Sequence, residues 1–189
     1  MNIYFRVLFI LLAFALARSS SASTNSADSI YELGQTWTNQ DGKAVAMDSL
    51  RGKVRVVAMF FSTCRYACPR ITADMKAIEA NLSPRQKSRT EFSMFSFDAD
   101  GDQPPQLKKF VKKMELDESR WSLFHGPEEN VRELAAVLGI SYRRELDGSF
   151  SHGNAITLLD TNGAIVFQQA GLGADPAGIL DAINRLTRR

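Results

Sequence analysis

Two cysteines separated by three residues are the first feature of this sequence that could carry chemistry. Cys64 and Cys68 lie in the segment FFSTCRYACPRI, and the 189-residue chain contains no other cysteine. Thiolates this close together either exchange disulfides with another molecule or bind a soft metal ion. A purely structural disulfide is the weaker interpretation, because closing so short a loop contributes only about 2 kcal/mol in the chain-entropy model.

The residues around the pair predict where the two thiols lie. Pro69 follows Cys68 directly, and proline favours the first helical position while restricting the residue before it to extended backbone. We therefore expect Cys68 to be the N-cap of a helix over residues 69–82, and Cys64 to lie in the loop after the preceding strand. The helix N-terminus favours the thiolate form, and Arg65 acts in the same direction.

A metal ion held by this pair would need a third ligand, and the sequence offers two histidines. His152 lies in GSFSHGNAITLLD, in a glycine-flanked loop before a predicted strand, whereas His125 lies at the end of another strand. Two thiolates and one imidazole suit Cu(I), which prefers soft ligands. The spacing alone does not decide whether either histidine reaches the cysteines, so a metal-free thiol pair stays open.

The elements that must position these residues alternate between strands and helices. The run VRVVAMFF, residues 54–61, is apolar except for Arg55 and predicts a strand buried on both faces, directly before the cysteines. Asp98, Asp100 and Asp102 form an acidic turn before a later helix. The expected order is a hairpin at 36–52, strands at 54–61, 90–98, 121–124, 154–160 and 164–169, and helices at 69–82, 105–114, 127–138 and 176–186. Such alternation predicts an α/β domain with a mixed central sheet covered on both faces.

The N-terminus has the layout of a secretory signal peptide. Arg6 precedes an apolar run from Val7 to Ala17, and a Ser- and Ala-rich segment follows. The run is shorter than the roughly 20 residues that cross a bilayer, so cleavage after Ala22 is favoured over an uncleaved anchor. We expect residues 1–22 to be the leader, residues 23–34 a flexible lead-in and residues 35–189 the folded domain.

The composition describes an ordinary globular protein. Hydrophobic residues make up 44% of the chain, charged residues 23%, and the formal net charge is +2. The small charge gives no signal for binding a polyanion, so no nucleic-acid partner is expected. An exported protein works where thiols can oxidise, so the two cysteines either pair or must be kept reduced.

Three segments of the chain resemble the Sco/SenC family of thioredoxin-like copper proteins. The segment NQDGKAVAMDSLRGKVRVVAMFFSTCRYACP is similar to that family's hairpin, buried strand and C-x-x-x-C-P motif. FSFDADGDQPPQLKKF is similar to its S-x-D-P-x-x-D-T-P segment, and FSHGNAITLLDTNG to its V-D-H-S stretch before an aliphatic strand. The chain departs from the family's usual pattern at Arg65, Tyr66 and Ala67, where Pro-Asp-Val is common, and at Ser151, where Asp is usual.

The resemblance implies a fold, a ligand set and a cellular role. The fold would be a thioredoxin-like three-layer sandwich with a mixed central sheet and an N-terminal β-hairpin. Cys64, Cys68 and His152 would be the copper ligands, for Cu(I) and also for Cu(II). The protein would be a metallochaperone in the periplasm or on the outer face of the inner membrane, delivering copper to an acceptor such as cytochrome c oxidase subunit II. Other periplasmic copper chaperones or thiol reductants would be further partners.

Other functions fit the same thiols. Cys64 and Cys68 could be the redox-active pair of a thiol:disulfide oxidoreductase that keeps partner cysteines reduced. Protection against copper or oxidative stress and an idle thioredoxin-like binding module are further alternatives. A peroxidase of the peroxiredoxin type is disfavoured, because the threonine expected three residues before its reactive cysteine is replaced by Phe61 or Arg65. Dependence on His152 separates a copper protein from an oxidoreductase.

Overall fold

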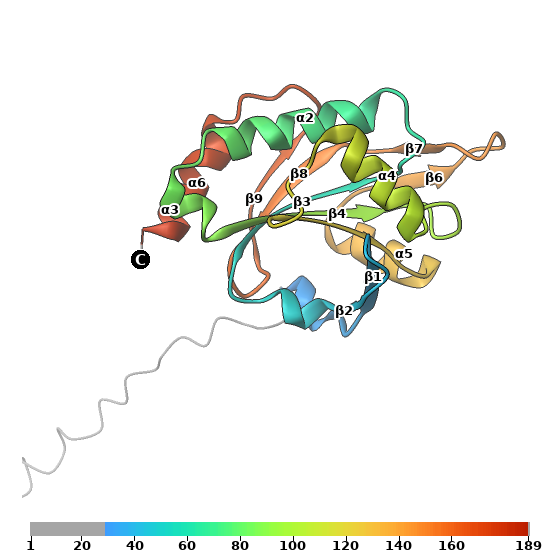
Figure 1. Ribbon diagram of the computed structural model, residues 1–189, viewed down its shortest axis with the longest axis horizontal. Helices are drawn as coiled ribbons and strands as arrows, with labels where there is room; N and C mark the ends of the chain where they lie inside the picture. Colours follow the sequence, from blue (N-terminus) through green and yellow to red (C-terminus); the bar gives the residue numbers. More distant parts are fainter. Residues whose placement is uncertain (1–28, 189) are drawn as a thin grey trace, which may run out of the picture.

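The structure, a computed structural model, describes residues 29–188. A seven-stranded mixed sheet organises this part of the chain (Figure 1). Its strand order is β2-β1-β5-β4-β3-β8-β9, and a separate two-stranded sheet pairs β6 with β7. The strands are β1 Thr36–Asn39, β2 Ala44–Ala46, β3 Val54–Phe60, β4 Thr90–Ser96, β5 Trp121–His125, β6 Tyr142–Arg144, β7 Phe150–His152, β8 Ala155–Leu159 and β9 Ile165–Ala170.

The central strand β3 leads directly to the cysteines. Every residue of β3 is buried, as its largely apolar run predicts for a strand covered on both faces, and the one charged residue, Arg55, pairs with Glu91. It runs parallel to β4 and antiparallel to β8, so it has hydrogen-bonded neighbours on both sides. The segment after Phe60 therefore leaves the sheet from a fixed point at its centre.

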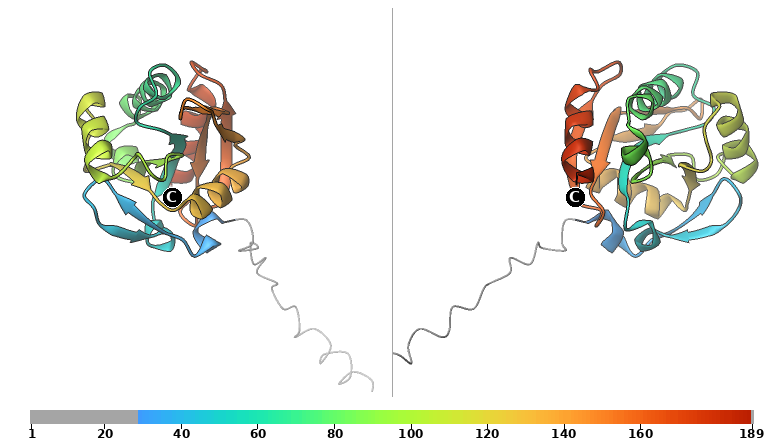
Figure 2. Two further views of the ribbon diagram at one scale, coloured as in Figure 1. Left: turned by 90° about the vertical axis from the view of Figure 1, so that its right-hand side faces the viewer. Right: turned by 60° about the vertical axis from the view of Figure 1, so that its left-hand side comes forward.

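Helices cover both faces of the sheet and complete a three-layer α/β architecture (Figures 1 and 2). Helices α2, α4 and α6 lie on one face, and α5 lies on the other. The helices are α2 Ala67–Ala80, α3 Pro84–Lys87, α4 Pro104–Met114, α5 Glu128–Val137 and α6 Ala177–Thr187, with short 3-10 helices η2 Ile30–Leu33 and η3 Met47–Leu50. The arrangement confirms the predicted α/β fold with a mixed sheet and an N-terminal hairpin, formed here by β1 and β2.

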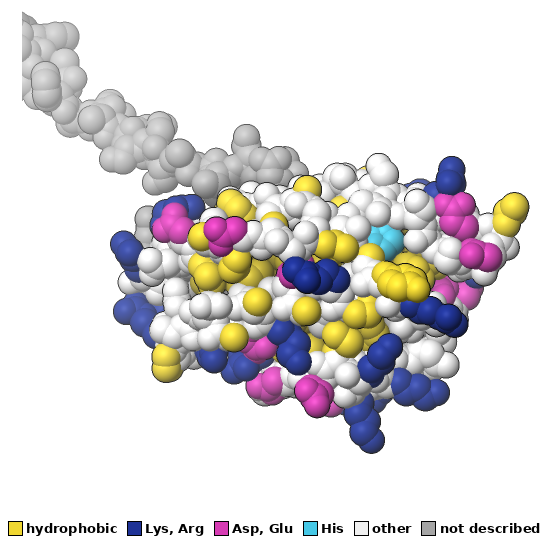
Figure 3. All heavy atoms as spheres, turned by 90° about the horizontal axis from the view of Figure 1, so that it is seen from above, with side chains coloured by type: hydrophobic (Ala, Val, Ile, Leu, Met, Phe, Trp, Pro, Cys, Tyr) yellow, Lys and Arg dark blue, Asp and Glu magenta, His cyan; other side chains and the backbone are white. Residues whose placement is uncertain are grey.

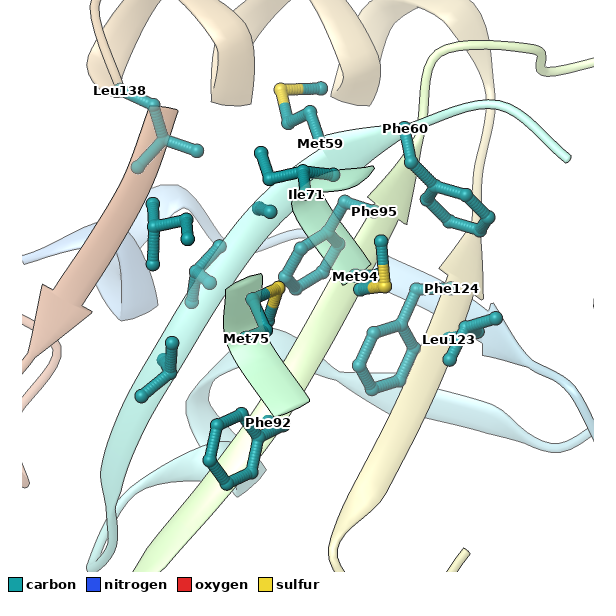
Figure 4. Close-up of a cluster of buried hydrophobic side chains, with 14 of the residues drawn as sticks. Met59, Phe60, Ile71, Met75, Phe92, Met94, Phe95, Leu123, Phe124 and Leu138 are labelled. Atoms are coloured by element: carbon teal, nitrogen blue, oxygen red, sulfur yellow. The ribbon is translucent and has the colours of Figure 1, made fainter. Parts of the chain in front are cut away.

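Apolar side chains from the sheet and helices form one continuous core, part of which is drawn in Figure 4. Aromatic rings stack between neighbouring strands: the ring centroids of Phe92 and Trp121 are 4.7 Å apart, and those of Phe95 and Phe124 are 4.9 Å apart. Helix α2 adds Ile71 and Met75 to the same cluster. This packing fixes the start of α2, which contains Cys68, relative to β3, and so fixes the loop between them that carries Cys64.

The packed part of the chain begins earlier than composition suggests. Ile30 and Tyr31 are fully buried in η2, within the segment expected to be a flexible lead-in over residues 23–34. Two apolar side chains anchor this end of the segment to the domain, which the surrounding small and polar residues concealed. The expected leader, residues 1–22, lies outside the described residues. Residues 29–188 contain no helix with the length and apolar character needed to cross a bilayer.

The β6–β7 hairpin is absent from the expected elements. Tyr142 pairs with His152, and Arg144 pairs with Phe150, so the stretch expected to be a glycine-flanked loop is a pair of short strands. Each strand has only three residues, with mostly exposed or half-buried side chains, and therefore lacks the apolar alternation by which strands are recognised. His152 consequently lies at the end of β7 and not in a loop.

Candidate functional site

The two cysteines lie at the junction between β3 and α2. Helix α2 begins at Ala67 with Tyr66 as its N-cap, so Cys68 is in the first helical turn. The expectation that Cys68 is the N-cap is therefore wrong by two residues, because the chain already turns into the helix before Pro69. Cys64 lies in the loop as expected, and the backbone N–H of Cys68 donates a hydrogen bond to Cys64 Sγ at 3.3 Å. Both thiols are free in this structure.

The two thiols have opposite acidities because their surroundings differ. Partial burial disfavours the thiolate of Cys64, but the backbone N–H groups of Cys68, Tyr66 and Ala67 and the Cys68 thiol outweigh it and lower the Cys64 pKa. Burial raises the pKa of Cys68, and neither the 3.4 Å bond from the Phe61 N–H nor any other contact offsets this. The arrangement gives one accessible, readily ionised sulfur and one buried, protonated sulfur.

We expect iodoacetamide to alkylate Cys64 first and Cys68 only after unfolding. Because the pKa of Cys64 is lowered, its alkylation rate should reach half its maximum below the pH of about 8.5 at which a free cysteine does so. Mass spectrometry of peptides after timed alkylation between pH 6 and pH 10 measures both rates. Equal labelling of the two cysteines in the folded protein would contradict this assignment.

Asp102 fastens the cysteine loop to the sheet. Its side chain is completely buried, accepts the backbone N–H of Ser62 at 2.9 Å, and also accepts the hydroxyls of Ser62 and Ser96. Ser62 lies two residues before Cys64, and Ser96 is the last residue of β4. The Asp102 carboxylate thus joins the end of β4 to the loop that follows β3. Sequence reasoning treated Asp102 as part of an acidic turn and missed this role.

His152 lies against the aromatic residues that precede and flank the cysteine loop. Its ring centroid is 4.7 Å from that of Phe97 and 5.8 Å from that of Phe61. The backbone N–H of Phe61 in turn bonds the sulfur of Cys68. His152 Nδ1 lies 2.9 Å from the carbonyl oxygen of Gly153. Because a carbonyl oxygen only accepts, the neutral ring donates from Nδ1 and keeps the Nε2 lone pair for a metal ion.

His125 occupies a different position. It is the last residue of β5 and lines a cavity of about 710 Å³ together with Tyr142 and Phe150. His152 instead borders a separate hollow of about 320 Å³ with Tyr142 and Arg143. Burial lowers the pKa of His125, although the charge of Asp102 partly opposes this, so the imidazole is held neutral. The expected strand-end position of His125 is confirmed.

The three expected ligands, Cys64, Cys68 and His152, lie at one end of the domain, but their side chains do not converge on a single metal position. Across residues 29–188, no three His, Cys, Asp or Glu side chains are gathered closely enough to hold a metal ion. The two cysteines touch each other, while His152 is joined to them through Phe61. The donor types suit Cu(I), and binding it requires His152 to approach the thiols.

A family model and a related protein both match most of this chain. The SCO1/SenC family model matches residues 24–188, which is most of the chain. The SCO1 protein homolog of Bacillus subtilis is 28% identical over 144 residues, a stretch that covers 75% of this chain and 74% of the relative.

Solved structures share the fold over a similar extent. A SCO1/SenC family lipoprotein from Bacillus anthracis is 31% identical, with a TM-score of 0.73, over 80% of this chain and 92% of that chain. BsSco, described as a member of the Sco family of cytochrome c oxidase assembly proteins with a disulfide switch, is 26% identical, with a TM-score of 0.71, over 82% and 91%. Arabidopsis thaliana ScoI, solved with copper bound, is 19% identical, with a TM-score of 0.68, over 81% and 95%. The architecture is therefore the thioredoxin-like fold of Sco proteins.

Proposed function

Since this chain belongs to the SCO1/SenC family, we propose that it is an exported copper chaperone that binds copper through Cys64, Cys68 and His152. It would pass the metal to an acceptor protein, with the copper site of cytochrome c oxidase subunit II as the client. Copper is the cargo of this reaction, and the two thiols and the imidazole hold it in transit.

One observation carries the proposal: two free thiols lie in contact, and the His152 imidazole packs on the aromatic residue that precedes their loop. Cys64 and Cys68 touch through the Cys68 N–H, and the His152 ring packs on Phe61, three residues before Cys64. Two soft sulfurs and one borderline nitrogen match the preference of Cu(I). Half-exposed Cys64 is the sulfur that an acceptor thiolate can approach, so the cargo can leave by stepwise exchange of ligands.

Titration with Cu(I) tests the ligand set. The reduced protein should bind about one copper ion per chain, and His152→Ala should weaken the affinity by about 100-fold, which corresponds to about 2.7 kcal/mol. His125→Ala is the matched control, because it removes the other imidazole and should leave the affinity unchanged. Competition with a chromophoric Cu(I) chelator measures all three proteins. Loss of a stoichiometric complex in the unaltered protein, or equal affinities for both histidine variants, would refute the proposal.

Two further observations support export and the oxidase as client. The first residues carry the pattern of a secretory leader, and the Bacillus anthracis relative is described as a lipoprotein. BsSco is described as a cytochrome c oxidase assembly protein. We therefore assign the protein to the periplasm or the outer face of the inner membrane. Deleting its gene should lower cytochrome c oxidase activity, and added copper should restore part of it.

A second candidate function, thiol:disulfide exchange, is favoured by the contrast between the two sulfurs. Cys64 has a lowered pKa and is half-exposed, as an attacking thiol requires, while Cys68 is buried behind it in the position of a resolving thiol. The reduced protein would then reduce the disulfide of insulin at a rate that His152→Ala does not change. If His152→Ala lowers both the rate of insulin reduction and the affinity for copper, the result would instead favour the chaperone.

A further inference from the structure

The surface beside Cys64 carries cationic side chains that no acidic group neutralises. Arg65 is exposed between the two cysteines, and Lys109 and Lys113 are exposed on α4. Among the described residues, none of these three has an ion-pair partner, whereas their neighbour Lys108 binds both Asp41 and Glu118. Unpaired cations on a folded protein leave a positive potential that a partner can use.

The two lysines of this set border the loop that carries Cys64. Lys109 and Lys113, one helical turn apart, line a hollow of about 210 Å³ with Ser62 and Thr63, the two residues before Cys64. Phe110 also lines this hollow. An acidic side chain entering it would meet two ammonium groups next to the residues that precede Cys64.

The acidic residues of the neighbouring turn are already engaged. Asp102 is buried and bonded to Ser62 and Ser96, and Asp98 accepts the backbone N–H of Gly101 at 2.9 Å. Asp100 forms an ion pair with Arg144. Among the described residues, none of these three carboxylates forms an ion pair with Lys109 or Lys113.

An exposed aromatic side chain follows Arg65 in the sequence. Tyr66, between the cysteines, is 87% exposed, a large fraction for a ring that could pack on the domain. Exposed tyrosine next to arginine is characteristic of surfaces that become buried in a protein complex. Figure 3 shows the face that carries α2 and α4, where apolar side chains and a histidine lie among several Lys and Arg side chains.

We propose that Arg65, Tyr66, Lys109 and Lys113 form a docking surface for the acceptor protein, and that this acceptor presents acidic side chains around its own cysteines. The inference rests on the proposed function and names the chemistry of its partner. Tyr66 supplies apolar contact, and the cations orient the acceptor so that its sulfurs meet Cys64.

Thiol exchange with charged peptides tests the surface without the natural partner. Two peptides of equal length each carry one internal disulfide, flanked by glutamates in one and by lysines in the other. The Cys64 thiolate attacks one peptide sulfur, the peptide disulfide breaks, and one peptide sulfur leaves as a thiolate. Cys68 loses its proton to solvent and displaces the second sulfur. The protein ends with a Cys64–Cys68 disulfide, and the peptide ends as a dithiol.

The reduced protein should oxidise with the acidic peptide about tenfold faster than with the basic peptide at low salt, and the ratio should approach one at high salt. Lys109→Glu/Lys113→Glu should invert the preference. Lys43→Glu/Lys112→Glu, which makes the same change in net charge away from the hollow, should preserve it. Because each ratio is taken within one variant, changes in thiol acidity cancel.

A ratio near one in the unaltered protein, or an equal effect of the two double variants, would overturn the docking surface. Cu(I) titration of Lys109→Glu/Lys113→Glu separates this outcome from failure of the proposed function. That variant should still bind about one copper per chain, since none of the three ligands is changed. If the unaltered protein binds no copper, the function fails while the peptide ratio can still be measured.

Discussion

Replacing Cys64 with serine should abolish stoichiometric Cu(I) binding by the reduced protein while leaving the fold intact. A hydroxyl is a hard, weakly acidic donor, so the substitution removes a soft ligand and leaves only Cys68 and His152. Cys64 lies in a loop and is half-exposed, so the change creates no cavity in the core. Chelator competition measures the affinity, and urea denaturation measures the free energy of unfolding.

Thr63→Ser is the matched control for this variant, because it alters the adjacent exposed loop residue and leaves both thiols in place. It should bind copper as the unaltered protein does. Retention of a tight one-to-one complex by Cys64→Ser would show that the thiol pair is not the copper site.

Replacing Asp102 with alanine should lower the free energy of unfolding by about 3 kcal/mol, because the Ser62 N–H and two hydroxyls lose their buried acceptor. The cysteine loop should also become more mobile, which limited proteolysis at that loop detects. Asp100→Ala is the matched control: that carboxylate is exposed and, within residues 29–188, its side chain pairs only with Arg144, so its loss should change stability by less than about 0.5 kcal/mol. Equal effects of the two variants would contradict the role of Asp102.

The pH dependence of stability reports on the same carboxylate. Burial raises the pKa of Asp102, despite the hydrogen bonds from Ser62 and Ser96. The folded state therefore binds this proton more tightly than the unfolded state, and the resulting stabilisation is lost as pH rises from about 3.9 through the raised value. Asp102→Asn cannot titrate, so its stability relative to the unaltered protein should increase across that window. Denaturation curves between pH 3 and pH 7 measure the difference.

The sequence predicted the central part of the fold more completely than its periphery. The largely apolar run 54–61 and the helical spacing of Ile71, Met75 and Ile78 identify β3 and α2, because burial on one or both faces produces those patterns. The β6–β7 hairpin has no such pattern, since its short strands pair only with each other. The order around the sheet and the start of α2 depend on contacts between distant residues.

The sequence predicted the candidate metal-binding residues but not the contacts that hold those residues in place. Residue type and spacing single out Cys64 and Cys68, and the family resemblance adds His152. No spacing rule links Ser62 to Asp102 or His152 to Phe61, because these contacts join elements that are far apart along the chain. The different environments of Lys108 and Lys109 also depend on the fold, because the fold places Lys108, and not Lys109, in an ion pair with Asp41.

Under the proposed function, the separate β6–β7 sheet would let different parts of the chain set the affinity for copper and the rate at which copper is released. Cys64 lies on a loop anchored to the centre of the main sheet and Cys68 lies in the first turn of α2, while His152 lies on a hairpin that has no strand in that sheet. Moving the hairpin breaks no ladder hydrogen bond of the seven strands. Under that proposal, substitutions in its turn, at Asp147 and Gly148, should change the rate of copper release without altering the thiols.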